Sequence, residues 1–180
     1  NDGVLKIPHN TWFIGTANKD DSKYTITDKV YDSAISINFD DRNEEFEVSG
    51  NAETLPISYE GLENLFNEAI NNKDYSLNQT ERQTFKIITD FTFETFDLTF
   101  GNRINHQINV FVPVFVATGG NKIDALDFMF SRKVISKLQG RFEDYIKQGL
   151  LDLRNLIVKH YGKDGFILTL KEIDKLLRKL

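Results

Sequence analysis

The chain has 180 residues, a length that fits one domain or a small α/β unit joined to a helical one. Hydrophobic residues make up 40% of it and include fifteen Phe, so the composition supports a packed core and excludes a disordered chain. The formal net charge of −5 argues against a dedicated nucleic-acid surface, and the lack of Cys excludes disulfides and a cysteine-built zinc site.

The apolar segments are too short to suggest a membrane protein. The longest, residues 110–117, falls well below the length that crosses a bilayer. The chain opens without the basic and apolar segments of a signal peptide, and a chain without Cys fits a reducing compartment. We therefore expect a cytoplasmic protein that makes no membrane contact.

Residues 1–57 have the pattern of short strands and turns. Residues 11–14 form a compact apolar run closed by Gly15, which is typical of a strand buried on both faces. Residues 27–34 predict a short helix, and residues 35–39 alternate apolar and polar side chains as a second strand does. We therefore expect residues 1–57 to form an α/β remnant.

Residues 58–180 show mainly helical periodicity and predict an α-helical bundle. Ser58 is positioned to cap a first helix, and Thr80 with Gln83 has the spacing of a capping box for the next. Pro113 predicts the kink or end of a further helix, because proline removes an amide donor and crowds the preceding turn.

The last helices have signals of the same kind. Asn121 or Asp124 is positioned to begin one helix, and Thr169 with Glu172 predicts a capping box that opens the final one. Arg132 has Lys133 and Lys137 nearby, and we interpret it as part of a solvated face. Residues 58–180 are thus expected to be mainly helical.

The strand at residues 11–14 leads directly into Gly15, Thr16, Ala17 and Asn18. Ligands of open α/β sheets bind just beyond the carboxyl ends of strands. A neutral amide such as that of Asn18 can hold a water or a γ-phosphate oxygen without adding negative charge. The alternative is an ordinary turn residue, since Asn tolerates left-handed backbone geometry.

Several motifs resemble those of AAA+ NTPases related to McrB, the NTP-driven subunits of modification-dependent restriction systems. The sequence WFIGTAN at residues 12–18, with ITDKVYD at 26–32, resembles the sensor 1 region of that family. FGNRI at residues 100–104 resembles the start of the family's helical lid, and residues 125–138 contain segments similar to its next helix.

The resemblance implies a function for three residues and for the two parts of the chain. Asn18 would be the catalytic sensor 1 residue, with Thr16 beside it at the nucleotide. Arg103 would be a sensor 2 cation, although a solvated arginine near a helix start fits equally well. Residues 1–57 would be the C-terminal part of the nucleotide-binding subdomain, and residues 58–180 the lid.

The family also implies cofactors and partners. The parent protein would hydrolyse ATP or GTP with Mg²⁺, assemble into a ring and engage a nuclease-type effector, with nucleic acid contacted only indirectly. The chain has no G-x-x-x-x-G-K-[ST] motif and no apolar strand with paired acids before Asn18. We therefore expect these 180 residues alone to be inactive and to bind nucleotide weakly.

Two alternatives to an active motor remain. Residues 32–34 are Asp, Ser and Ala where relatives often carry an arginine finger, which favours a non-catalytic helical scaffold that docks a nuclease or another effector. An independent nucleic-acid-binding domain is the other, and the acidic balance opposes it. Asp20 and Asp21 are interpreted as turn-capping acids, so no metal site is predicted.

Overall fold

The fold is an α-helical bundle. The computed structural model describes residues 3, 5–17, 27–39, 50, 53–141 and 143–180, and no strand occurs within these ranges. No helix of this described part is long and apolar enough to span a membrane.

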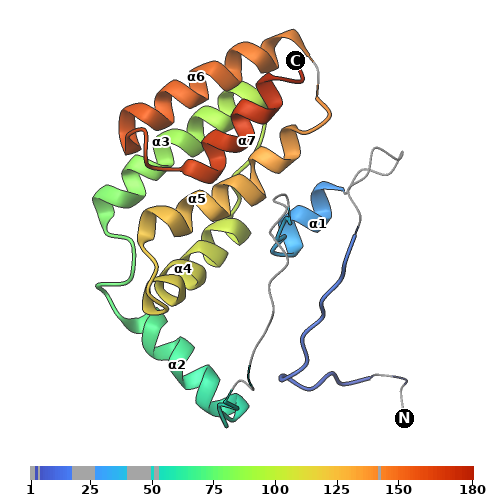
Figure 1. Cartoon of the computed structure of the whole chain (residues 1–180), viewed down its shortest axis with the longest axis vertical. Coiled ribbons are helices and arrows are strands. Elements are labelled where there is room, and N and C mark those ends of the chain that lie inside the picture. Colours follow the sequence, from blue (N-terminus) through green and yellow to red (C-terminus); the bar gives the residue numbers. More distant parts are fainter. Residues whose placement is uncertain (1–2, 4, 18–26, 40–49, 51–52, 142) are drawn as a thin grey trace.

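Seven α-helices and one short 3-10 helix, η1, make up this structure. In chain order they are α1 (Asp28–Ser33), α2 (Tyr59–Asn71), α3 (Gln79–Phe96), α4 (Asn102–Ala117), α5 (Lys122–Lys133), η1 (Ile135–Leu138), α6 (Asp144–Tyr161) and α7 (Ile167–Leu177). In Figure 1 the bundle extends from α6 at one end to α2 at the other. Helix α5 packs against α4, α7 and η1, while α3 packs against α6.

Helix α5 is the central helix of the bundle. Every residue from Ala125 to Lys133 is buried except Phe128, which is half-buried. Four of the buried residues are polar or charged: Asp127, Ser131, Arg132 and Lys133. Because buried polar groups are costly unless they find partners, the neighbouring elements of α5 have to supply those partners.

Two helices begin where local sequence predicts. The Ser58 Oγ accepts a hydrogen bond from the Gly61 amide at 3.0 Å at the start of α2. The Asn121 Oδ1 accepts one from the Asp124 amide at 2.9 Å at the start of α5. Each bond satisfies an amide that has no partner within its own helix, so both predicted caps are confirmed.

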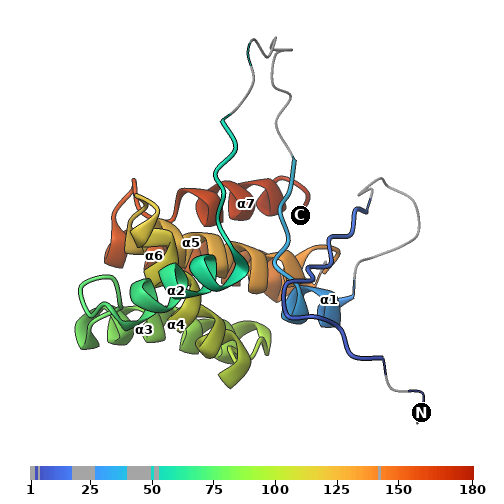
Figure 2. The same ribbon diagram turned by 90° about the horizontal axis from the view of Figure 1, so that it is seen from below.

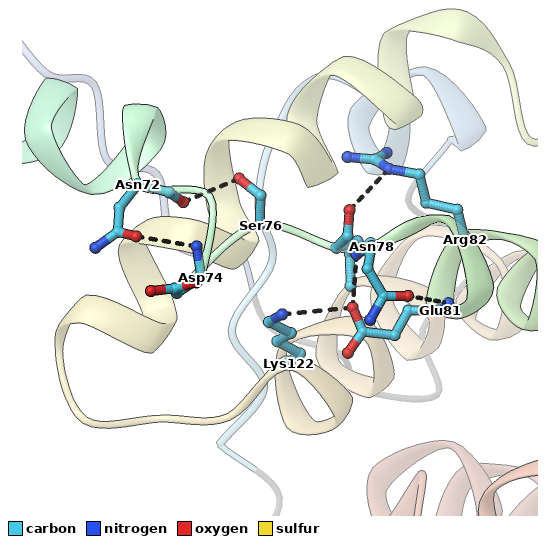
Figure 3. Close-up of polar contacts among 8 residues, drawn as sticks. Asn72, Asp74, Ser76, Asn78, Glu81, Arg82 and Lys122 are labelled. Atoms are coloured by element: carbon cyan, nitrogen blue, oxygen red, sulfur yellow. Dashed lines mark hydrogen bonds and ion pairs between the residues drawn. The ribbon is translucent and has the colours of Figure 1, made fainter.

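The predicted capping box at Thr80 and Gln83 is wrong by two residues. Helix α3 begins directly after Asn78, whose Oδ1 accepts from the Glu81 amide at 2.9 Å while the Glu81 Oε2 accepts from the Asn78 amide at 2.7 Å. The same Glu81 oxygen lies 3.4 Å from the Lys122 Nζ of α5 (Figure 3). This tertiary contact favours the earlier start, because it ties the capping carboxylate to a second helix.

The predicted capping box of the last helix, Thr169 with Glu172, is also wrong. Helix α7 begins directly after Phe166, which has a left-handed backbone with φ of 57° and no side chain that can cap. The carboxylate of Asp127 takes this role from α5, accepting the Leu168 amide at 2.7 Å and the Thr169 amide at 2.8 Å. A residue 41 positions away in sequence therefore caps α7.

One of the two predicted outcomes at Pro113, the end of its helix, does not occur. Helix α4 continues through the buried Pro113 to Ala117. Only one turn of helix follows the proline, and the packing of α4 against α2 and α5 holds it in place. Gly119, with φ of 95°, then reverses the chain toward α5 in a backbone geometry that glycine adopts easily.

The two predicted strands of the N-terminal part do not form here. Trp12 and Ile14 are 68% and 91% exposed and Phe39 is 95% exposed, so the prediction of a strand buried on both faces is wrong. Strands are stable when neighbours pair with their backbone and cover their side chains, and the described residues supply no such neighbour. Figure 2 shows these segments running beside and away from the bundle. The division at residue 57 stays a prediction.

Removing the carboxylate of Asp127 tests the link between α5 and α7. We expect Asp127→Ala to lower the free energy of unfolding by about 2 kcal/mol, because it leaves two amides at the start of α7 without an acceptor. Urea unfolding followed by circular dichroism measures the change. Asp90→Ala, which removes a surface ion pair with Lys86, is the matched control and should cost no more than about 0.5 kcal/mol. Equal effects of the two substitutions would contradict the capping role.

The pH dependence of stability gives a second test of Asp127. Burial raises its pKa above the ordinary 3.8, and the hydrogen bonds from Thr169 and Leu168 only partly oppose that rise. The folded state then binds the proton more tightly than the unfolded state, so this group's contribution to stability falls as pH rises between the two pKa values. The stability advantage of the native chain over Asp127→Asn should therefore shrink from pH 3.5 to pH 7. A stability advantage of the native chain that grows from pH 3.5 to pH 7 would contradict a raised pKa of Asp127.

Candidate functional site

Arg103 lies in the first turn of α4, where the lid resemblance places a cation. Its side chain is exposed, and it makes no hydrogen bond or ion pair in the part of the chain that the structure describes. Gly101 is the N-cap and supplies no capping side chain, and the first turn contains no acid. The positive end of the α4 dipole and the Arg103 charge therefore act together, an arrangement that favours anions.

The other two predicted site residues are not brought to Arg103 by the described structure. Thr16 lies in an extended, exposed segment. Asn18 falls outside the described residues, as do Asp20 and Asp21. The assignment of Thr16 and Asn18 as nucleotide-facing residues stays a prediction from the sequence motif.

Helix α1 joins the N-terminal part to the bundle at one end of α5. It forms within the predicted 27–34 segment, and Thr27 is its N-cap without a side-chain hydrogen bond. Helix α1 packs on α5 and η1. The Lys133 Nζ, whose side chain is only 1% exposed, donates to the Ala34 carbonyl oxygen at 2.7 Å. This bond satisfies a carbonyl at the end of α1 and a buried ammonium at the end of α5.

Arg132 is buried, so its interpretation as part of a solvated face is wrong. Its guanidinium lies 5.8 Å from the centre of the Phe128 ring, within the range of a cation–π contact. The Phe128 ring in turn stacks on Phe111 of α4 at 5.5 Å. Aromatic rings on two helices therefore hold the arginine at the α4–α5 contact. The aromatic residue four positions before Arg132 was the one signal of this burial in the sequence.

Cations thus gather at one end of the α4–α5 pair. The two helices are consecutive, joined by a short turn and packed together, so the start of α4 and the end of α5 lie at the same end. Arg103 begins one helix there, and Arg132 and Lys133 finish the other. This end can attract an anion, and the described residues contain no group of three His, Asp or Glu placed to hold a metal.

Tyr161, which packs against the core, also has a shifted pKa. Burial raises the pKa of Tyr161 to about 12, with a smaller contribution from the charge of Glu81. The Tyr161 ring packs on Phe166 at 4.4 Å, at the entry to α7. Its contacts are those of a packing residue.

The comparisons with known proteins identify one family. A model described as a domain of unknown function, DUF8727, matches residues 51–180, a range that includes α2 to α7 together with Arg103, Arg132 and Lys133. No curated protein and no solved structure matches the chain. The chain therefore belongs to the DUF8727 family.

Proposed function

We propose that the chain is the C-terminal part of a cytoplasmic McrB-like AAA+ NTPase. Its helical bundle would be the lid that closes over a nucleotide, and its N-terminal segment would supply the sensor 1 strand. ATP or GTP with Mg²⁺ would bind to the parent protein, which would act as a ring with a nuclease-type effector.

The placement of Arg103 is the observation that carries this proposal. Phe100 and Gly101 lead directly into α4, and Arg103 is exposed in its acid-free first turn. Helix α1, which follows Asn18 in the chain and overlaps the second part of the sensor 1 motif, contacts the same end of the bundle through α5 and η1. A lid cation and the segment after sensor 1 would both have to lie near one nucleotide, and this arrangement is compatible with that requirement.

The exposed side chains of the N-terminal segment support the α/β part of the proposal. Residues 12–14 and the alternating positions of 35–39 carry large apolar side chains that the bundle does not cover. Isolated extended segments with such side chains gain stability by joining a sheet. In the parent NTPase they would be strands of the nucleotide-binding subdomain.

A non-catalytic scaffold is the second candidate. The same exposed apolar residues, and the Asp, Ser and Ala at residues 32–34 in place of an arginine finger, favour a role in binding a protein. The bundle would then dock an effector without turning over nucleotide. The two candidates differ in whether Asn18 affects hydrolysis.

The 180 residues alone should not hydrolyse nucleotide. They contain no phosphate-binding loop and no paired acids ahead of Asn18, so the β- and γ-phosphates and Mg²⁺ lack their main ligands. A steady-state phosphate-release assay with Mg-ATP and Mg-GTP should give the buffer rate. Robust Mg²⁺-dependent turnover by these 180 residues would refute the proposal that the phosphate-binding loop and the paired acids lie elsewhere in the parent protein.

Substitution of Asn18 tests the catalytic assignment in a protein that joins this chain to a phosphate-binding loop. We expect Asn18→Ala to lower kcat roughly 100-fold with little change in nucleotide affinity, because a group that orients the reacting water or phosphate acts mainly in the transition state. Asn10→Ala, before the same strand motif, is the matched control and should leave kcat unchanged. Unaltered turnover by Asn18→Ala would remove Asn18 from the catalytic mechanism.

A further inference from the structure

Among the residues that the structure describes, a buried cation without an anionic partner lies near the end of α5. The side chain of Arg132 is 9% exposed, and its Nε donates no hydrogen bond. The described residues place no carboxylate in an ion pair with it, and its recorded contact is the ring of Phe128. Because arginine keeps its charge at any ordinary pH, such burial is strongly unfavourable unless an acceptor completes it.

Two other cations of the bundle, the buried Lys133 and the half-buried Arg141, do have oxygen acceptors. The Lys133 Nζ donates to the Ala34 carbonyl oxygen at 2.7 Å. The Arg141 guanidinium donates to the Phe96 carbonyl oxygen at 3.2 Å. The fold therefore supplies oxygen acceptors where it buries positive charge, and Arg132 departs from this rule.

The register of α4 and α5 places polar residues of α4 near Arg132. Phe111 and Phe128 stack across the two antiparallel helices at 5.5 Å. One turn from this pair, toward the start of α4 and the end of α5, the corresponding residues are Gln107 and Arg132. Arg103 lies one further turn along the same side of α4, about 6 Å along the helix axis. A second cation and the acid-free start of α4 therefore lie at the same end of the α4–α5 pair as the buried guanidinium.

We infer that Arg132 binds an oxyanion at this end of the α4–α5 pair. A guanidinium presents a planar fork of N–H donors that matches the oxygens of a phosphate or a carboxylate. The Phe128 ring covers one face of the fork and fixes its plane, so the edge donors remain for the ligand. Arg103 and the first-turn amides of α4 add positive potential at the approach.

Phosphate and carboxylate ligands share this chemistry but have different sources. A phosphate would come from the nucleotide, and this choice rests on the proposed function. A carboxylate would come from an acidic side chain or the C-terminus of a partner, and it does not require nucleotide binding. The oxyanion site itself depends only on the buried guanidinium.

The test compares the native 180-residue chain with Arg132→Met, which keeps the length and apolar character of the stem. Binding of inorganic pyrophosphate and of succinate is measured by isothermal titration calorimetry and by the shift in Tm, with ionic strength held constant by NaCl. At least one probe should bind the native chain and raise its Tm, while Arg132→Met should bind it at least tenfold more weakly. Without ligand, the Tm of Arg132→Met should equal or exceed that of the native chain.

Arg178→Met is the matched control, because Arg178 is an exposed arginine directly after α7 that donates to the Asp174 carbonyl oxygen. It should retain full binding. If circular dichroism shows that Arg132→Met does not fold, Arg132→Lys replaces it, since it keeps the charge, removes the fork and should still weaken binding.

The outcomes separate the site from the proposed function. Tighter binding of pyrophosphate supports the site and its phosphate ligand, whereas tighter binding of succinate supports the site and counts against a nucleotide. Equal binding by the native chain and the Arg132 variant would overturn the inference. So would the absence of any response to both probes.

Discussion

The structure depends on the need to satisfy polar groups on a helix that is almost wholly buried. Helix α5 lies between α4 and α7, yet it carries Asp127, Arg132 and Lys133 among its buried residues. An apolar helix in this place would pack against its neighbours without selecting among them. Each buried charge instead demands a partner at a definite position, so it selects one arrangement of the neighbouring elements.

Two of these charges are satisfied by distant parts of the chain. Asp127 accepts the first amides of α7 and thereby supplies the cap that Phe166 cannot provide. Lys133 donates to the carbonyl of Ala34 and attaches the N-terminal part to the bundle. Within the described part of the chain, the third, Arg132, contacts the ring of Phe128 and has no hydrogen-bonded acceptor, and for this reason we assign it to a ligand rather than to the fold. In the proposed NTPase, α5 would connect the segment that follows sensor 1 with the lid.

The sequence predicts the features that depend on neighbouring residues and misses those that depend on distant ones. Ser58 and Asn121 are visible as caps because each donor lies three residues from its acceptor. The start of α7 is not predictable in this way, because its capping carboxylate, Asp127, comes from another helix. The burial of Arg132 is hidden for a similar reason, since a run of basic residues normally marks a solvated face and only packing against α4 shows otherwise.

The predicted strands at residues 11–14 and 35–39 show a different limit of prediction from sequence. Their apolar patterns are those of strands, but a strand requires a neighbouring strand, and pattern alone does not supply one. The predicted site shares this limit: Arg103 lies at an exposed helix start as the motif implies, while Thr16 lies in an extended segment that the bundle does not cover.

The Nε–Hε resonance of Arg132 in a ¹⁵N–¹H spectrum tests most directly the claim that this buried guanidinium binds an anion. The signal is assigned by its loss in Arg132→Met. A protected guanidinium that donates to an oxyanion should give a resolved, slowly exchanging signal that moves as inorganic pyrophosphate or succinate is added. A rapidly exchanging signal at the position of solvated arginines, unmoved by either anion, would contradict the account.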